Sequence, residues 1–180
     1  MNTKAFLTAI LAVIAGAAVC WPAFGQDQET WRCNVENGRY STNRQSISPG
    51  AHSLTGQIQF HSGQFGDHWS PVAHIAFTDA KLPTNADCFC NGVRASIYPD
   101  EPDTVKFFMI FNGKSELIAQ AAVGRAITFS LAIDDAGVLT VVIGKTNPVK
   151  GTAEVLHPQR DMVHMDCSGG DVSFLNVQPG

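Results

Sequence analysis

Two groups of polar side chains alternate with apolar residues in segments that are typical of β-strands. In residues 54–61, "LTGQIQFH", Leu54, Ile58 and Phe60 alternate with polar positions, and residues 92–98, "GVRASIY", repeat the period of two. Amide, imidazole, guanidinium and phenol groups hydrogen-bond sugar hydroxyls and carboxylates, and an aromatic ring can stack on a sugar. This pattern predicts a ligand site, although it also fits the solvated face of an antiparallel sheet. The candidate ligand-binding residues are Gln57, Gln59, His61, His74, Arg94, Tyr98 and Trp69.

Other clusters of polar residues could bind a metal ion. His61, Asp67, His68 and His74 lie close together in the sequence, but a His-x6-His-x5-His spacing corresponds to no metal site that we can derive. Residues 134–137, "DDAG", could bind calcium, yet a turn explains this stretch equally well. We therefore predict no metal and no cofactor.

Four cysteines follow residue 25, and an even number in an exported chain is typical of disulfides. Cys88 and Cys90 are separated by one residue, so a bond between them would close a very tight ring. We predict one bridge from this segment to Cys33 and a second to Cys167, each stabilising by about 2–4 kcal/mol. The spacing does not match a zinc site, and thiol exchange by Cys88 and Cys90 is a less economical alternative.

Residues 1–25 have the order and composition of a secretory signal peptide. Lys4 precedes an apolar run over residues 5–19, which is shorter than the roughly 20 residues that cross a bilayer. Small residues at 23–25 predict cleavage after this stretch, with export to the periplasm or out of the cell and no transmembrane segment after cleavage. A lipid anchor through Cys20 is the minor alternative.

The remaining chain has a size that suits one domain. We divide it into an N-terminal segment, residues 26–49, that leads into a β-sandwich domain at residues 50–180. The whole chain has 12 Lys and Arg against 16 Asp and Glu, a net charge of −4, and its charges are scattered. This argues against nucleic acid as a partner, because nucleic-acid binding requires a basic surface.

A hydrophobic period of two recurs along most of the chain and predicts about nine or ten short strands and no helix. Asn112-Gly113 predicts a hairpin with a type I′ turn, residues 134–137 predict a second turn, and Ser168-Gly169-Gly170 predicts a third. Many short strands between turns favour an antiparallel sandwich or barrel.

The order of these segments resembles the concanavalin A-like lectin/glucanase jelly roll, a superfamily that includes laminin G-like domains. The ribbon "ITFSLAIDDAGVLTVVIG" and the terminal "DCSGGDVSFLNVQ" correspond to the strand pair and last strand of that fold, and the likeness covers residues 50–178. The resemblance implies an all-β, two-sheet antiparallel sandwich whose last strand pairs back onto its first. It also implies a ligand surface on the concave sheet, and it bears on fold more than on function.

Enzymes of this superfamily provide two tests of catalysis. Retaining glucanases carry a Glu-x-Asp-x-x-Glu strand that supplies two catalytic carboxylates, and this chain has none. Alginate-lyase-like members use Gln, His, Arg and Tyr, and Gln59, His61, Arg94 and Tyr98 are the right residue types. However, "QIQFH" departs from their Gln-Ile-His pattern, and their other motifs are absent.

We therefore interpret the sequence as an exported, disulfide-bonded β-sandwich that binds a glycan or a cell-envelope component without catalysis. A polysaccharide-degrading enzyme on the same fold and a structural or protein-interaction domain are the two alternatives.

Overall fold

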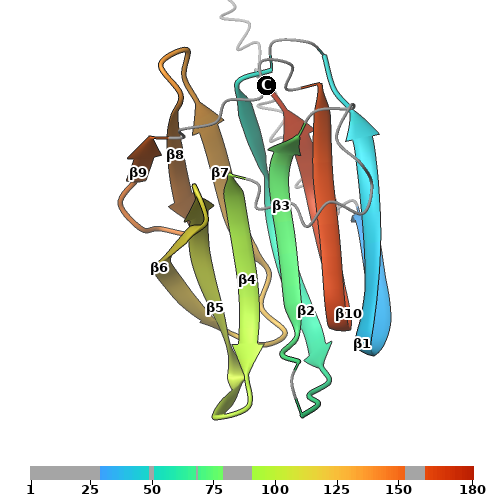
Figure 1. Cartoon of the computed structure of the whole chain (residues 1–180). Coiled ribbons are helices and arrows are strands. Elements are labelled where there is room, and N and C mark those ends of the chain that lie inside the picture. Colours follow the sequence, from blue (N-terminus) through green and yellow to red (C-terminus); the bar gives the residue numbers. More distant parts are fainter. Residues whose placement is uncertain (1–28, 49–50, 68, 79–90, 153–160) are drawn as a thin grey trace, which may run out of the picture.

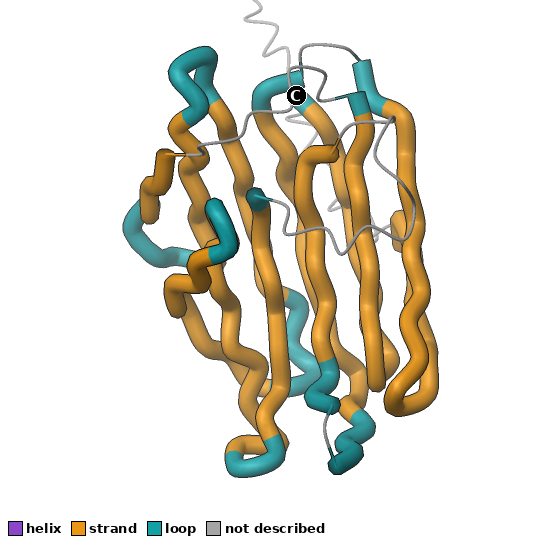
Figure 2. Tube along the Cα trace, in the orientation of Figure 1, coloured by secondary structure: helices purple, strands orange, loops and turns teal. Residues whose placement is uncertain are grey.

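A computed structural model describes residues 29–48, 51–67, 69–78, 91–152 and 161–180. All regular structure in these ranges is β-strand (Figures 1 and 2). The predicted signal peptide, with Cys20, and also His68, Cys88 and Cys90 lie outside the described residues. No helix in the described part of the chain is long and apolar enough to span a membrane.

The described strands are β1 (Glu29–Ser46), β2 (Ser53–Gly63), β3 (Val72–Thr78), β4 (Gly92–Tyr98), β5 (Glu101–Phe111), β6 (Lys114–Ala122), β7 (Ile127–Ile133), β8 (Val138–Ile143), β9 (Val149–Thr152) and β10 (Met162–Pro179). Their hydrogen-bonded order is β6-β5-β4-β3-β10-β2-β7-β8-β9, and β1 pairs with β10 as well. Every pairing is antiparallel. The predicted all-β antiparallel fold is therefore confirmed.

Strand β10 divides this sheet into two layers. Its first half, residues 162–168, pairs with β3 and continues into β4, β5 and β6, which we call the front sheet. Its second half, residues 170–179, pairs with β2 and continues into β7, β8 and β9, the back sheet. In Figure 1, β3, β4 and β5 lie in front of β2 and β7. The last strand pairs with β2, as the resemblance implied.

The two sheets enclose one hydrophobic core, because the period of two puts alternate side chains of each strand between them. Ile75, Val93 and Phe107 of the front sheet and Ile58 and Phe129 of the back sheet are almost fully buried in it. Burial of each such side chain stabilises the fold by about 1.5–3 kcal/mol. The residues between them point outward, so each sheet has one outer face.

Two of the three predicted turns are confirmed. Asn112 and Gly113 have φ angles of 48° and 71°, as a type I′ turn between β5 and β6 requires. Between β7 and β8, the Gly137 N–H donates to the Asp134 carbonyl at 3.0 Å, and the Val138 N–H donates to Asp134 Oδ1 at 2.8 Å. The Asp134 side chain thus stabilises the turn.

The predicted turn at Ser168-Gly169-Gly170 is wrong, because β10 runs through it as a single bent strand. Gly169 has a φ angle of 64°, and a Cβ at Gly170 would lie 2.8 Å from the Ser62 carbonyl oxygen. Both positions therefore favour glycine. Opposite this bend, the register of β1 shifts between Val35 and Tyr40.

The predicted pairing of Cys33 and Cys167 with the Cys88-Cys90 segment is also wrong. Cys33 and Cys167 form a disulfide with each other, with Cα atoms 6.2 Å apart. No strand was predicted before residue 50. In the structure, β1 lies beside β10 along its length and brings the two cysteines together. Both cysteines are buried members of the hydrophobic core, and Cys167 lies two residues before Gly169 in β10.

Replacing both bridge cysteines, Cys33→Ser with Cys167→Ser, is expected to lower the free energy of unfolding by about 2–4 kcal/mol, because the bridge restricts the unfolded chain. Urea denaturation measures the change. Ser41→Ala, opposite Cys167 in β1, is the control and should stay within about 0.5 kcal/mol of wild type. Non-reduced peptides that join Cys33 or Cys167 to Cys88 or Cys90 would contradict the pairing.

Candidate functional site

The candidate ligand-binding residues lie on opposite outer faces of the sandwich. His74, Arg94 and Tyr98 belong to strands β3 and β4 and lie on the outer face of the front sheet. The other sheet residues, Gln57, Gln59 and His61 of β2, lie on the outer face of the back sheet. Trp69 lies in the connection between β2 and β3 and is 56% exposed. The two groups therefore cannot form one site.

On the outer face of the back sheet, the polar side chains bind one another or the backbone. His61 Nε2 lies 2.9 Å from Ser173 Oγ, and Gln59 Nε2 donates to the Gly124 carbonyl at 2.7 Å. Arg32 donates two hydrogen bonds to Asp171, at 2.9 and 2.7 Å, and they hold the pKa of that carboxyl below its usual value. This face resembles the ordinary solvated face of an antiparallel sheet.

The outer face of the front sheet has a polar network centred on Asp166 in β10. His74 Nδ1 lies 2.7 Å from Asp166 Oδ1, and His164 Nε2 lies 2.9 Å from Oδ2. Tyr40 of β1 hydrogen-bonds to the same carboxylate. Asp166 and His164 are each only 2% exposed, although both point away from the core.

Donor and acceptor roles in this network follow from its chemistry. Arg44 Nε, which can only donate, lies 3.2 Å from His164 Nδ1, so that nitrogen accepts and the His164 proton is on Nε2. An ionised carboxylate only accepts, so both imidazoles donate to Asp166. His74 consequently presents Nε2 as its remaining ring nitrogen, and its side chain is 30% exposed.

Asp166 is ionised in the folded protein. Burial alone would raise its pKa, but hydrogen bonds from His164 and His74, the charge of His74 and a hydrogen bond from Tyr40 lower the pKa from 3.8 to about 2. The network therefore places a fixed negative charge beneath the imidazole of His74.

A row of paired residues connects this network to a cluster of cations and aromatic rings. The strand register places Asp166 opposite His74, His74 opposite Arg94 and Arg94 opposite Phe108. The guanidinium carbon of Arg94 lies 4.9 Å from the centre of the Phe108 ring. Such contacts stabilise by about 0.5–2 kcal/mol and hold the cation in place.

Lys106 and Tyr98 form a second pair of this kind beside the row. Lys106 Nζ lies 5.3 Å from the centre of the Tyr98 ring, which meets Phe108 edge-on with centres 6.4 Å apart. Lys106 also donates to Glu101 at 2.8 Å, and this hydrogen bond raises the pKa of the lysine. We call His74, Arg94, Tyr98, Lys106 and Phe108 the front-face cluster.

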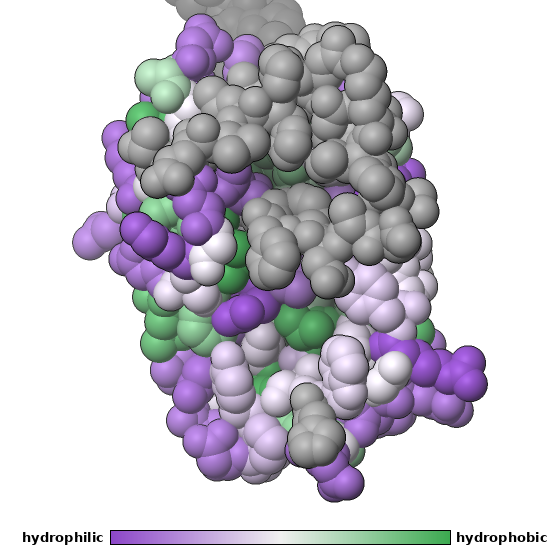
Figure 3. Space-filling model, viewed as in Figure 1, coloured by the Kyte–Doolittle hydropathy of each residue, from purple (hydrophilic) through white to green (hydrophobic). Residues whose placement is uncertain are grey.

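Where Figure 3 leaves described residues visible on this side, hydrophobic and hydrophilic surfaces lie side by side. This mixture fits an amphipathic ligand such as a sugar, which has polar hydroxyls and apolar ring faces.

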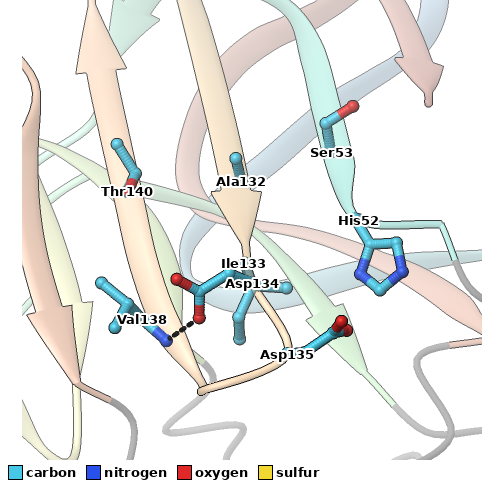
Figure 4. Close-up of a pocket in the computed structure, with 8 residues that line it drawn as sticks. All are labelled: His52, Ser53, Ala132, Ile133, Asp134, Asp135, Val138 and Thr140. Carbon is cyan, nitrogen blue, oxygen red and sulfur yellow. Dashed lines mark hydrogen bonds between the residues drawn. The ribbon is translucent and has the colours of Figure 1, made fainter.

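A separate shallow hollow of about 350 Å³ lies on the back sheet, beside the turn between β7 and β8 (Figure 4). The Asp134 carboxylate there is turned toward Val138 and accepts its N–H, while His52 and Asp135 lie at the side of the hollow. No aromatic ring apart from the His52 imidazole lines it. We therefore place the candidate site on the front face. The full lining is His52, Ser53, Ala132, Ile133, Asp134, Asp135, Val138 and Thr140.

No three His, Cys, Asp or Glu side chains in the described ranges gather where they could hold a metal ion. Asp166 and His164 were not among the predicted site residues, although the alternation in "VHMDC" places both on the face opposite Val163 and Met165. Phe108 and Lys106 were not among them either, although the same signal was available. Arg44 and Tyr40 gave no signal, because their segment has no clear apolar alternation.

Comparison with known proteins adds information on the fold. No family model matches the chain, and no curated protein matches it by sequence. Among solved structures, a sialidase matches with a TM-score of 0.62 and 9% identity over 83% of this chain, which spans 15% of that protein. Scytalido-glutamic peptidase matches with a TM-score of 0.51 and 11% identity, covering 82% of this chain and 76% of that one. The fold is an antiparallel jelly-roll β-sandwich.

A carbohydrate-binding module, CBM66 from Bacillus subtilis, matches with a TM-score of 0.44 and 15% identity, covering 81% of this chain and 83% of that one. All these identities are low, so the matches concern the jelly roll and not the residues on its faces.

Acid should remove the stabilisation that ionised Asp166 provides. Its folded pKa lies below its usual 3.8, so this stabilisation is complete above that pH and is lost as the pH falls toward about 2. The loss should reach about 2 kcal/mol. In Asp166→Asn this part of the pH dependence should be absent, as measured by urea denaturation from pH 6 to 2. Exposed Asp103→Asn is the control, and an unchanged pH profile in Asp166→Asn would contradict the assignment.

Proposed function

We propose that this chain is an exported, non-catalytic module that binds a glycan or a related cell-envelope component at the front-face cluster. The observation that carries the proposal is the row His74, Arg94 and Phe108 beside Lys106 and Tyr98. Hydrogen-bond donors for sugar oxygens lie there next to aromatic rings, on three adjacent strands whose backbone positions are fixed by the sheet.

The Cys33–Cys167 disulfide supports the export part of the proposal, because disulfides persist in oxidising compartments. The predicted signal peptide agrees with export to the periplasm or out of the cell.

The carboxylates of the front face support a role in binding without catalysis. A glycosidase needs two carboxyl groups on either side of the bond that it cleaves. Asp166 is buried under two imidazoles, and Glu101 is paired with Lys106, so neither is presented to a ligand as a free acid or nucleophile.

Binding to a glycan array tests this function, with product release from polysaccharides followed in the same samples. We expect saturable binding without product. Tyr98→Ala should weaken it at least 10-fold, because the variant loses a ring of the cluster. The matched control is His61→Ala on the opposite face, which should bind like wild type.

The reverse result, with loss in His61→Ala and none in Tyr98→Ala, would place the site on the back sheet and contradict the proposal. Product release would favour the polysaccharide-degrading alternative. Absence of binding to every glycan on the array would reject the glycan function and favour a structural or protein-interaction role.

A further inference from the structure

Arg94 is a cation without a neutralising partner in the described part of the chain. Its Nη2 donates to Ser115 Oγ at 3.0 Å, and its Nε is buried without a hydrogen-bond acceptor. A guanidinium has five N–H donors in a planar fork, and a buried donor without an acceptor costs free energy. Because Nε is buried, an added acceptor would reach the guanidinium at Nη1, which has no hydrogen-bond partner among the described residues.

Three other basic residues of the described chain are paired with a carboxylate. Arg32 binds Asp171 through two hydrogen bonds, Lys106 binds Glu101, and Arg39 lies 3.5 Å from Glu36. Arg94 forms no ion pair with a described carboxylate, and it is held on the Phe108 ring instead. Its positive charge is thus both fixed in position and uncompensated.

His74 lies directly across from Arg94 on β3, where paired residues have Cβ atoms roughly 5 Å apart. Its Nδ1–H is bound to Asp166, so the ring cannot turn freely, and Nε2 has no partner among the described residues. Nε2 is thus held in a defined position beside the guanidinium. The two groups together form a preorganised receptor for one anionic group.

We propose that Arg94 and His74 bind a carboxylate, and that the ligand of the front-face cluster is an acidic glycan containing uronate sugars. This inference rests on the proposed function and adds the ligand class. A planar carboxylate matches the guanidinium fork, which can donate two parallel hydrogen bonds to it. Tyr98 and Phe108 then supply the apolar contacts for the sugar ring.

Nuclear magnetic resonance of the full-length chain tests the carboxylate directly, with the Arg94 Nε–H and His74 ring signals as probes. Sodium galacturonate is titrated at constant ionic strength, and galactose is the matched probe, because it differs only in having a hydroxymethyl group in place of the carboxylate. We expect saturable shifts with galacturonate and at least 10-fold weaker ones with galactose.

Variants assign the effect to the guanidinium. Arg94→Ala should raise the dissociation constant for galacturonate at least 10-fold, as read from the His74 signals. Arg94→Lys keeps the charge and the fold but lacks the fork, so it should also bind more weakly than wild type. Arg125→Ala, at an exposed arginine after β6, is the control and should bind like wild type.

Equal shifts with galactose and galacturonate would overturn carboxylate recognition and leave the proposed glycan function standing. Absence of any shift at Arg94 and His74 would also overturn carboxylate recognition. The proposed glycan function would then be tested by the glycan array alone. Wild-type affinity in Arg94→Ala would show that the anion binds elsewhere, which also overturns the inference.

Discussion

Strand β10 belongs to both sheets because it bends at Gly169 and Gly170. Gly169 has a φ angle of 64°, and a Cβ at Gly170 would lie 2.8 Å from the Ser62 carbonyl oxygen of β2. Before the bend it pairs with β3, after the bend with β2, and β1 follows it on its other side through both halves. The backbone groups of one strand thus connect the front and back sheets, and the disulfide fixes β1 to β10 beside the bend. Of its three neighbours, β3 continues into β4, β5 and β6 of the front sheet, and β2 continues into β7, β8 and β9 of the back sheet.

The same strand explains why a charged network lies on the front face. His164 and Asp166 point outward from β10, yet they are almost as fully buried as its inward residues. A carboxylate in such a place is stable only when hydrogen bonds offset the loss of water. Asp166 meets this condition with donors from β1, β3 and β10 itself. This buried carboxylate also orients a residue at the surface, because it binds Nδ1 of the partly exposed His74.

The sequence was sufficient for features that depend on local patterns. Alternation located the strands from β2 to β8, and Asn112-Gly113 located its hairpin, because φ angles and side-chain direction are determined by residues close in the chain. It was insufficient for β1, whose segment has few apolar residues and is held by pairing with the distant strand β10. Arg44 of β1, for example, lies opposite His164, 120 residues away in the sequence. The cysteine pairing failed for the same reason, since it depends on the register of β1 and β10. Alternation identified Arg94, but only the register could show that His74 and Phe108 flank it.

An acidic ligand is compatible with a chain whose net charge is −4, because salt screens exposed charges over roughly 8 Å at physiological ionic strength. A bound carboxylate responds mainly to the charges close to it. Along the row that contains Arg94, the acidic residue is Asp166, whose carboxylate already accepts hydrogen bonds from two imidazoles. On the back face, by contrast, the Arg32 fork is saturated by Asp171. Both faces carry polar side chains. They differ in whether the charged side chains are already paired with one another through hydrogen bonds and ion pairs. Among the described residues, the front face has in Arg94 a cation that is held on an aromatic ring and forms no ion pair, and this difference favours the front face as the ligand-binding side.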